Sequence, residues 1–458
     1  MESIFQWISV VNGVVWGAPM MILVIGTGIW LTLGTRVVQV TQFVHGWGLV
    51  LRGAFRRDQS ELNDGDITPF QALMTAISGT VGNGNIAGVA TAISLGGPGA
   101  PLWMWLTGLV GMATKCSEAL LGVKYRERES DGTMSGGPMY FLKNGLGISW
   151  LGWLYALFGA VAALGMGNMV QSNSVALVFR TELGVSEWVT GVGLAVMTWL
   201  VLIGGIKRIA HVAEVLVPLM CITYVIGGLV IIFAKGSEIP AAFGLIFNSA
   251  FTGQAALGGF VGAGVAQTIR YGVARGVFSN EAGVGTAAIA HGAARTNIPA
   301  RQGTIAMLGV FIDTLLVNTI TTLSIVLTGA WSTGLTSTAL TAHAFSNVLG
   351  KAGGWIVAFA SVSFGYSTLL TWSYYGLKCT NFLLGVKVSL AYRWIWCLVI
   401  IVGALFSSDV AGIKFIWDIA DTLNGAMAIP NLIALLGLSP LIFREVRAYS
   451  QSSSSSEA

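Results

Sequence analysis

Eleven apolar runs of about twenty residues divide this chain of 458 residues, and they constrain its fold more than any other feature. A bilayer core is about 30 Å thick, so a helix needs about 20 apolar residues to cross it. Only 10% of the residues are charged, against about 25% in soluble domains. The sequence therefore predicts an all-α polytopic membrane protein with about 11 transmembrane helices. We place the spans at 14–34, 69–95, 100–122, 150–178, 187–206, 211–234, 255–290, 303–330, 353–377, 393–408 and 412–437.

The distribution of basic residues between these runs predicts the orientation of the chain. If the N-terminus lies outside, one side of the membrane carries most of the 24 Lys and Arg residues, with Arg270, Arg275 and Arg295 among them. The positive-inside rule makes this richer side cytoplasmic. We therefore expect a multi-pass protein of the plasma (bacterial inner) membrane, with its N-terminus outside and its C-terminus in the cytoplasm. The opposite side then carries Arg180, Lys235, Lys351 and Lys414.

Two of the runs are interrupted by glycines and polar residues. The first interruption, residues 79–85, holds three glycines and two asparagines, and the second extends from Arg275 to Gly285. Each glycine costs about 0.8–1 kcal/mol relative to alanine in a helix, and unwound backbone at membrane depth is tolerated only when it is buried in protein or lines a polar cavity. A glycine-rich helix contact explains either segment alone about equally well. Both together, at matching positions, predict an inverted-repeat transporter with a site near the midplane.

The positions of the interruptions also predict the domain organisation. When the first span is set aside, each interruption falls in the first helix of a set of five. We expect a peripheral N-terminal transmembrane helix with a basic cytoplasmic loop (1–60), and two five-helix repeats (61–240 and 241–440). A disordered cytoplasmic tail (441–458), ending in a serine run, is expected to follow. The predicted core is thus a five-plus-five inverted repeat with two discontinuous helices.

Four stretches carry a resemblance to a known family, and they occur in the family's order between Pro69 and about Pro430: GTVGNGNIAGVATAI, GGPGAPLWMWLTGLVGMATKCSEALLG, RGVFSNEAGVG and FGYSTLLTWSYYG. Through them the chain resembles the alanine/glycine:cation symporter (sodium:alanine symporter) family, which has the amino acid-polyamine-cation type fold. Pro101-Leu102 and Leu377 depart from the family pattern. The resemblance implies symport of alanine, glycine or another small neutral amino acid with Na⁺, or less often with a proton, by alternating access.

The resemblance also implies a substrate site and a cation site. An amino-acid zwitterion needs acceptors for its ammonium and donors for its carboxylate, and the two ends of a broken helix supply both. Without the family, Gln171 is equally well explained as an interhelical hydrogen bond, and the adjacent Ser367 and Thr368 as hydroxyls bonded to their own helix. Carried over by motif, the substrate-binding residues are Thr80, Gly82, Asn83, Gly84, Asn85, Gln171, Phe278 and Trp372. The Na⁺ ligands are Ser78, Val81, Ser367 and Thr368.

Ionisable residues within the spans are further candidates. Lys115 and Glu118, three apart on one helix, are expected to neutralise each other. Asp313 is our choice for proton coupling, although a hydrogen bond to a neighbouring helix explains it better. Arg270, Arg275, Glu281 and Arg295 are candidates for a cytoplasmic gate network, which ordinary anchoring explains equally well.

Two other function classes remain as alternatives, an intramembrane enzyme and a channel. Neither a metal motif such as HExxH nor a Walker motif occurs, so we expect a transporter driven by an ion gradient rather than an enzyme. We expect no organic cofactor, no nucleic-acid partner and no obligatory protein partner.

Overall fold

The structure is a computed structural model that describes residues 10–55, 64–252, 264–406 and 410–457. Most of the described chain is helical, as expected of an all-α membrane protein. Six described helical segments are long and apolar enough to cross a membrane, and two shorter apolar helices, Ala18–Gly34 and Glu187–Leu202, accompany them. The six are Ser149–Leu183, Gly205–Ala234, Pro299–Leu327, Lys351–Leu384, Val386–Leu405 and Trp417–Gly437.

The N-terminal helices precede the first predicted repeat. The helix α2 (Ala18–Gly34) ends in a hydrogen-bonded turn at residues 35–37. Arg36 and Val37 in this turn both have the left-handed backbone conformation. This turn redirects the chain into two short helices. These are α3 (Val38–Thr41) and α4 (Phe43–Phe55).

The first predicted repeat begins with the first interrupted helix. Thr68 caps it through a reciprocal capping box with Gln71, and Pro69 occupies the first turn, where its missing N–H is tolerated. The helix is split, because α5 (Pro69–Thr80) is followed by the π-helix η2 (Gly84–Gly88) and by α6 (Val89–Gly96). The remaining elements are α7 (Ala100–Lys124), β1 (Glu127–Arg128), β2 (Met134–Ser135), α8 (Pro138–Asn144), α9 (Ser149–Ala162), π-helix η3 (Ala163–Met169), α10 (Val170–Leu183), α11 (Glu187–Leu202) and α12 (Gly205–Ala234).

The second predicted repeat contains the second interrupted helix, which is divided into α14 (Val265–Asn280) and α15 (Thr286–Gly292). The helix runs through Gly276 and breaks only at 281–285, so the interruption is shorter than the 275–285 segment expected. The part of the predicted 255–290 span before residue 264 lies outside the described residues. The other elements are η4 (Gly236–Glu238), α13 (Ile239–Thr252), α16 (Pro299–Val310), π-helix η5 (Phe311–Val317), α17 (Asn318–Leu327), η6 (Ala330–Ser332), α18 (Ser337–Leu349), α19 (Lys351–Leu384), η7 (Val386–Val388), α20 (Ser389–Leu405) and α21 (Val410–Gly437).

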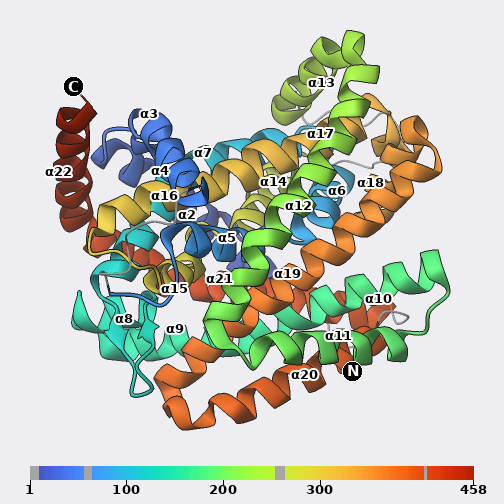
Figure 1. Cartoon of the computed structure of the whole chain (residues 1–458). Coiled ribbons are helices and arrows are strands. Elements are labelled where there is room, and N and C mark those ends of the chain that lie inside the picture. The colour runs from blue at the N-terminus through green and yellow to red at the C-terminus, as the bar shows by residue number, and fades with distance from the viewer. Residues whose placement is uncertain (1–9, 56–63, 253–263, 407–409, 458) are drawn as a thin grey trace.

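Helices at corresponding places of the two predicted repeats pack against each other. Helix α7 follows the first interruption and α16 follows the second, and these two helices pack against each other. Helix α11 of the first repeat packs against α20 of the second. The long helix α19 packs on α9, η3 and α10 on one side and on α12 and α5 on the other. Figure 1 shows α18 at the right-hand end of the molecule, whereas α8, the hairpin and α22 lie at the left-hand end.

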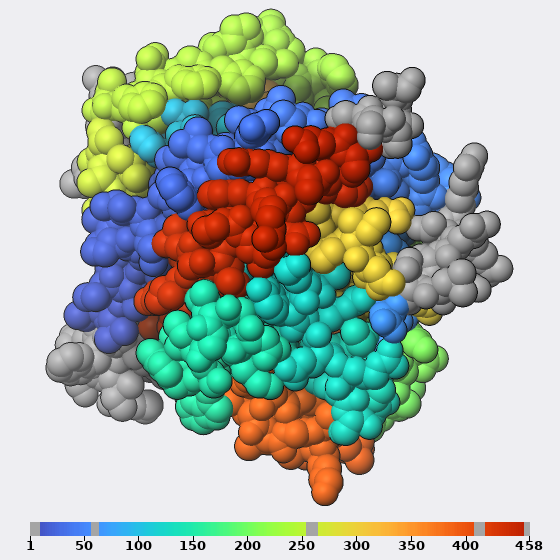
Figure 2. All heavy atoms as spheres, turned by 90° about the vertical axis from the view of Figure 1, so that its left-hand side faces the viewer, coloured from blue at the N-terminus to red at the C-terminus, as the bar shows by residue number. Residues whose placement is uncertain are grey.

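The C-terminal tail differs from its prediction, because α22 (Ser439–Glu457) is helical rather than disordered. Ile442 and Val446 are buried, and the Arg447 guanidinium donates to the Gly34 carbonyl at 2.6 Å. The helix packs on α2, α7 and α16, and Figure 2 shows the red C-terminal segments on this face of the molecule beside the blue N-terminal ones. The serine run conceals the signal, since the apolar residues that anchor the helix come before it.

Candidate functional site

The first break exposes main-chain groups in the middle of the protein. Val81 ends α5 with φ −73° and ψ 88°, and the last carbonyls of such a helix have no intrahelical partner. Residues 78–88 are all buried. The break therefore lies in the protein interior, where the sequence predicts a site for a small polar ligand.

Packing of α5 on α19 brings three of the four predicted Na⁺ ligands together. The hydroxyls of Ser367 and Thr368 each lie 3.2 Å from the Ser78 carbonyl and 2.9 Å from the Phe364 carbonyl of their own helix. The Ser78 hydroxyl in turn donates to the Ser367 carbonyl at 2.9 Å. All are buried, as is Val81. Hard cations prefer oxygen ligands, and this cluster consists of neutral oxygens alone.

Five of the predicted substrate residues meet across three helices. The Asn83 amide donates to Gln171 Oε1 at 3.1 Å and accepts from the Ser361 hydroxyl at 2.6 Å. Gly82 lies between Gln171 and Thr368, because a Cβ built on it would be 3.7 Å from Gln171 Oε1 and 2.7 Å from Thr368 Oγ1. The substrate and cation clusters are thus contiguous at Gly82. The other two of the five residues, Gly84 and Phe278, also lie together, because the Phe278 ring would be 3.3 Å from a Cβ built on Gly84.

Asn85 has a different set of partners from Asn83. Its amide donates to Asp313 Oδ1 at 2.7 Å and to Asn318 Oδ1 at 2.9 Å, while its own oxygen accepts from the Gly82 N–H at 3.0 Å. Asp313 also accepts from Ser279 at 2.9 Å and from Thr314 at 2.7 Å. This buried carboxylate therefore joins both interrupted helices to η5, which agrees with the interhelical hydrogen bond that we favoured for it.

The second break is held by two charged residues of α7. Lys115 Nζ donates to the Asn280 carbonyl at 2.8 Å, at the negative end of α14. Glu118 Oε1 accepts from the N–H groups of Gly283 at 2.8 Å and Gly285 at 3.0 Å, just before α15 begins. Each charge is therefore opposite in sign to the helix end that it binds. The expectation of simple mutual neutralisation missed this role, since it considered one helix only.

Trp372 and Thr80 make their hydrogen bonds away from the substrate cluster. The Trp372 indole donates to Glu281 Oε1 at 2.9 Å, at the second break, and its Cβ would lie 2.2 Å from a Cβ on Gly167 in η3. The Thr80 hydroxyl donates back to the Ala76 and Ile77 carbonyls of its own helix. The structure therefore places Trp372 between η3 and the second break, and gives Thr80 a local partner.

The four charged residues that we expected to form a cytoplasmic gate, Arg270, Arg275, Glu281 and Arg295, do not bind one another. Arg275 forms a bidentate ion pair with Asp421, at 2.7 and 3.2 Å, and lies over the Phe278 and Trp417 rings. Glu281 instead bonds Thr286 and Trp372, and Arg295 follows α15 beside Asp66. Arg275 precedes the break and Arg295 follows it.

Several residues of the site carried no signal in the sequence. Ser361 and Asn318 sit in apolar runs where isolated polar residues are common. The π-helices η3 and η5 were also missed, although such segments are frequent at functional sites. Only their packing around the two breaks identifies them.

Comparison with known proteins places this geometry in context. The model of the sodium:alanine symporter family matches residues 1–458. The sodium/alanine symporter AgcS of Methanococcus maripaludis is 48% identical over 452 residues, which cover 97% of each chain. A Bacillus subtilis protein named "Probable sodium/glutamine symporter GlnT" is 34% identical and covers 98% of this chain and 92% of its own. A crystal structure of a manganese transporter mutant from Eremococcus coleocola shares the fold alone, with a TM-score of 0.50, 13% identity, and coverage of 84% of this chain and 82% of that chain.

Proposed function

The chain belongs to the sodium:alanine symporter family and is a Na⁺-coupled amino-acid symporter in a membrane, not an enzyme, and from this premise we propose that its substrate is a small neutral amino acid such as alanine or glycine. The observation that carries the proposal is the contiguity of the two clusters at Gly82. The backbone of the first break and Gln171 bind the zwitterion, while Ser78, Val81, Ser367 and Thr368 bind Na⁺.

Substrate size is set by the side chains around the break. Phe278 closes over Gly84 and is itself stacked on Trp417, with ring centroids 5.5 Å apart. A methyl group on Gly82 would crowd the Thr368 hydroxyl, at 2.7 Å. A pocket so bounded accepts a methyl side chain and little more. Discrimination between glycine and alanine is modest, because one methylene contributes about 1–3 kcal/mol.

The coupling of amino-acid transport to Na⁺ follows from the contact between the two proposed sites at Gly82. Gly82 and Thr368 contact both clusters, so Na⁺ binding orders the backbone that the amino acid uses. Alternating access then moves the first five-helix unit against the second, with the N-terminus outside and the C-terminus in the cytoplasm. The two interrupted helices support this arrangement, because each belongs to a different five-helix unit.

Uptake into proteoliposomes tests the proposal. We expect labelled L-alanine to accumulate when a Na⁺ gradient is imposed, and not when choline replaces Na⁺ or when a proton gradient is applied alone. Competition by glycine, D-alanine and L-glutamine then ranks the substrates. Saturable accumulation above the external concentration distinguishes a symporter from a channel. Equal accumulation with choline would contradict Na⁺ coupling.

A further inference from the structure

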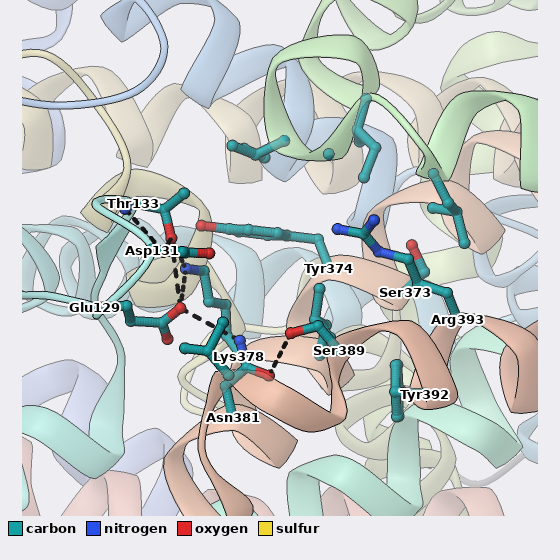
Figure 3. Close-up of a pocket in the computed structure, with 16 residues that line it drawn as sticks. Glu129, Asp131, Thr133, Ser373, Tyr374, Lys378, Asn381, Ser389, Tyr392 and Arg393 are labelled. Atoms are coloured by element: carbon teal, nitrogen blue, oxygen red, sulfur yellow. Dashed lines mark hydrogen bonds and ion pairs between the residues drawn. The ribbon is translucent and has the colours of Figure 1, made fainter.

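A second polar pocket lies away from both breaks, on the side of the membrane predicted to be cytoplasmic. It has a cavity volume of about 130 Å³. Figure 3 shows that its walls come from the β1–β2 hairpin, α19 and α20, and the first turns of α12 close it. No part of the proposed transport site lines it. We propose that this pocket is a second, weaker binding site for an amino-acid zwitterion.

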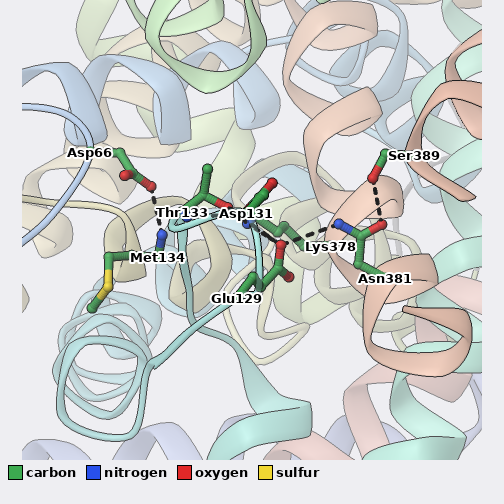
Figure 4. Close-up of polar contacts among 8 residues, drawn as sticks. All are labelled: Asp66, Glu129, Asp131, Thr133, Met134, Lys378, Asn381 and Ser389. Atoms are coloured by element: carbon green, nitrogen blue, oxygen red, sulfur yellow. Dashed lines mark hydrogen bonds and ion pairs between the residues drawn. The ribbon is translucent and has the colours of Figure 1, made fainter. Parts of the chain in front are cut away.

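The hairpin side of the pocket is built around a buried ion pair. Lys378 Nζ lies 3.0 Å from Glu129 Oε2 and 2.9 Å from the Thr133 hydroxyl, and both charged side chains are less than a tenth exposed. Asn381 also donates to Glu129 Oε2, at 3.2 Å. Figure 4 shows these contacts as part of a series of hydrogen bonds, which begins at Asp66 and Met134 on the hairpin and ends at Asn381 and Ser389. The hairpin is therefore fixed to α19 and forms a rigid wall.

Three buried oxygens of pocket-lining residues have no partner among the described residues. They are Glu129 Oε1 and the hydroxyls of Tyr374 and Tyr392. A buried polar atom left unpaired costs about 1–3 kcal/mol, so a pocket lined by three of them favours a polar occupant. Figure 3 shows the Tyr374 side chain extending across the pocket toward the hairpin. A carboxylate oxygen and a phenol oxygen can each accept from an ammonium group.

The α20 side supplies the opposite charge. Arg393 lines the pocket, and its guanidinium makes no hydrogen bond or ion pair with any residue that the structure describes. Figure 3 shows it entering the pocket from the side opposite the hairpin. A free guanidinium binds a carboxylate through two parallel hydrogen bonds.

The balance of charge selects a zwitterion over a simple ion. Glu129 and Asp131 oppose Lys378 and Arg393 among the lining residues, so a lone cation or anion gains no net attraction. Glu129 Oε1 and the Tyr374 hydroxyl are free acceptors toward the hairpin side, while the Arg393 guanidinium enters from α20. An α-amino acid carries the complementary pair of charges, and the apolar wall of Leu202, Ile206 and Ile209 suits a short side chain. The assignment rests on the proposed function for the identity of the ligand.

Equilibrium binding of labelled L-alanine to the purified full chain in nanodiscs tests this site. We expect two components, one that requires Na⁺ and a weaker one that persists in choline. Arg393→Gln should weaken the second component about tenfold or more, since it removes a charge-assisted contact, and should retain the Na⁺-dependent component as evidence of folding. Lys387→Gln, an exposed basic residue of η7 outside the pocket, is the matched control and should retain both.

Two further arms separate a binding role from a structural one. Tyr374→Phe should weaken the second component severalfold, whereas Tyr155→Phe, which removes another unpaired buried hydroxyl outside the pocket, should not. Propionate and ethylamine each lack one charge of alanine and should compete poorly. A single component in the wild type, or equal competition by propionate, overturns the assignment. Loss of the Na⁺-dependent component in the wild type contradicts the proposed transport site instead, so the two failures are distinguishable.

Discussion

Lys115 and Glu118, one turn apart on α7, bind the two ends of the same broken helix, with the lysine on the Asn280 carbonyl and the glutamate on the Gly283 and Gly285 amides. Glu281, Gly283 and Gly285 all have positive φ, so the intervening backbone cannot bond itself as a helix does. The two charges replace the missing helical hydrogen bonds. This clamp makes a stable break possible at a depth where water is scarce.

Glu118→Ala tests the clamp. The substitution leaves the Gly283 and Gly285 amides without their acceptor, removes one of the two acceptors of the Asn431 side chain and leaves the buried Lys115 uncompensated. Breaking a buried charge pair in this way costs about 3–5 kcal/mol. We expect lower thermal stability in detergent and loss of alanine uptake. Glu118→Gln keeps one acceptor oxygen and should recover part of both, and wild-type behaviour of Glu118→Ala would refute the role.

Thr368→Ala tests the cation site. Removal of its hydroxyl deletes one Na⁺ ligand, so the Na⁺ concentration for half-maximal uptake should rise about tenfold. Thr368→Ser should restore the wild-type value. The control is Thr380→Ala, because Thr380 lies on the same helix and its hydroxyl only bonds the Gly376 carbonyl. An unchanged Na⁺ dependence in Thr368→Ala would exclude this hydroxyl as a ligand.

Gly82→Ala tests the point where the two clusters meet. The new methyl would lie 2.7 Å from Thr368 Oγ1, and this crowding should reduce uptake by more than about tenfold, since overpacking typically costs 1–3 kcal/mol. Gly88→Ala is the control, because nothing lies within 4 Å of a Cβ there. Initial uptake rates, normalised to the amount of reconstituted protein, are the measurement. Similar rates for both variants would place the substrate elsewhere.

Asp313→Asn tests whether the buried carboxylate serves structure or proton coupling. The carboxylate accepts hydrogen bonds at both oxygens, and an amide nitrogen at either position would face a donor. We expect a loss of about 1–3 kcal/mol in stability and slower uptake, with the ratio of Na⁺ to alanine unchanged. If the variant instead lost a dependence on the proton gradient shown by the wild type, Asp313 would be the proton carrier.

Phe278→Ala tests the control of substrate size. Loss of the ring that covers Gly84 enlarges the pocket, so uptake of larger neutral amino acids such as valine should increase about tenfold relative to alanine. The readout is the ratio of uptake rates for valine and alanine in one preparation. Tyr140→Ala, which removes an aromatic ring packed on Phe382 outside the spans, should leave this ratio unchanged. A ratio unaltered by Phe278→Ala would remove Phe278 from the pocket.

The sequence by itself determined the membrane class, the approximate spans and the two breaks. These depend on local properties, since an apolar run of sufficient length must cross a bilayer and a run of glycines and asparagines cannot remain helical there. The adjacent hydroxyl residues Ser367 and Thr368 were also visible in the sequence, because they interrupt an apolar run. The family resemblance connected both of them to Ser78. The structure then moved the second break to 281–285 and replaced the disordered tail by α22.

The tertiary structure alone decided which groups meet. Lys115 and Asn280 are 165 residues apart, Asn85 and Asp313 are 228 apart, and Lys378 and Glu129 are 249 apart. Such contacts depend on the rotation and axial offset of one helix against another, which result from the packing of all side chains at once. A periodicity shows that a residue is buried, but not which partner it faces. The roles of Lys115 and Glu118, the three π-helices and the pocket beside the hairpin therefore emerged only when the helices were packed together.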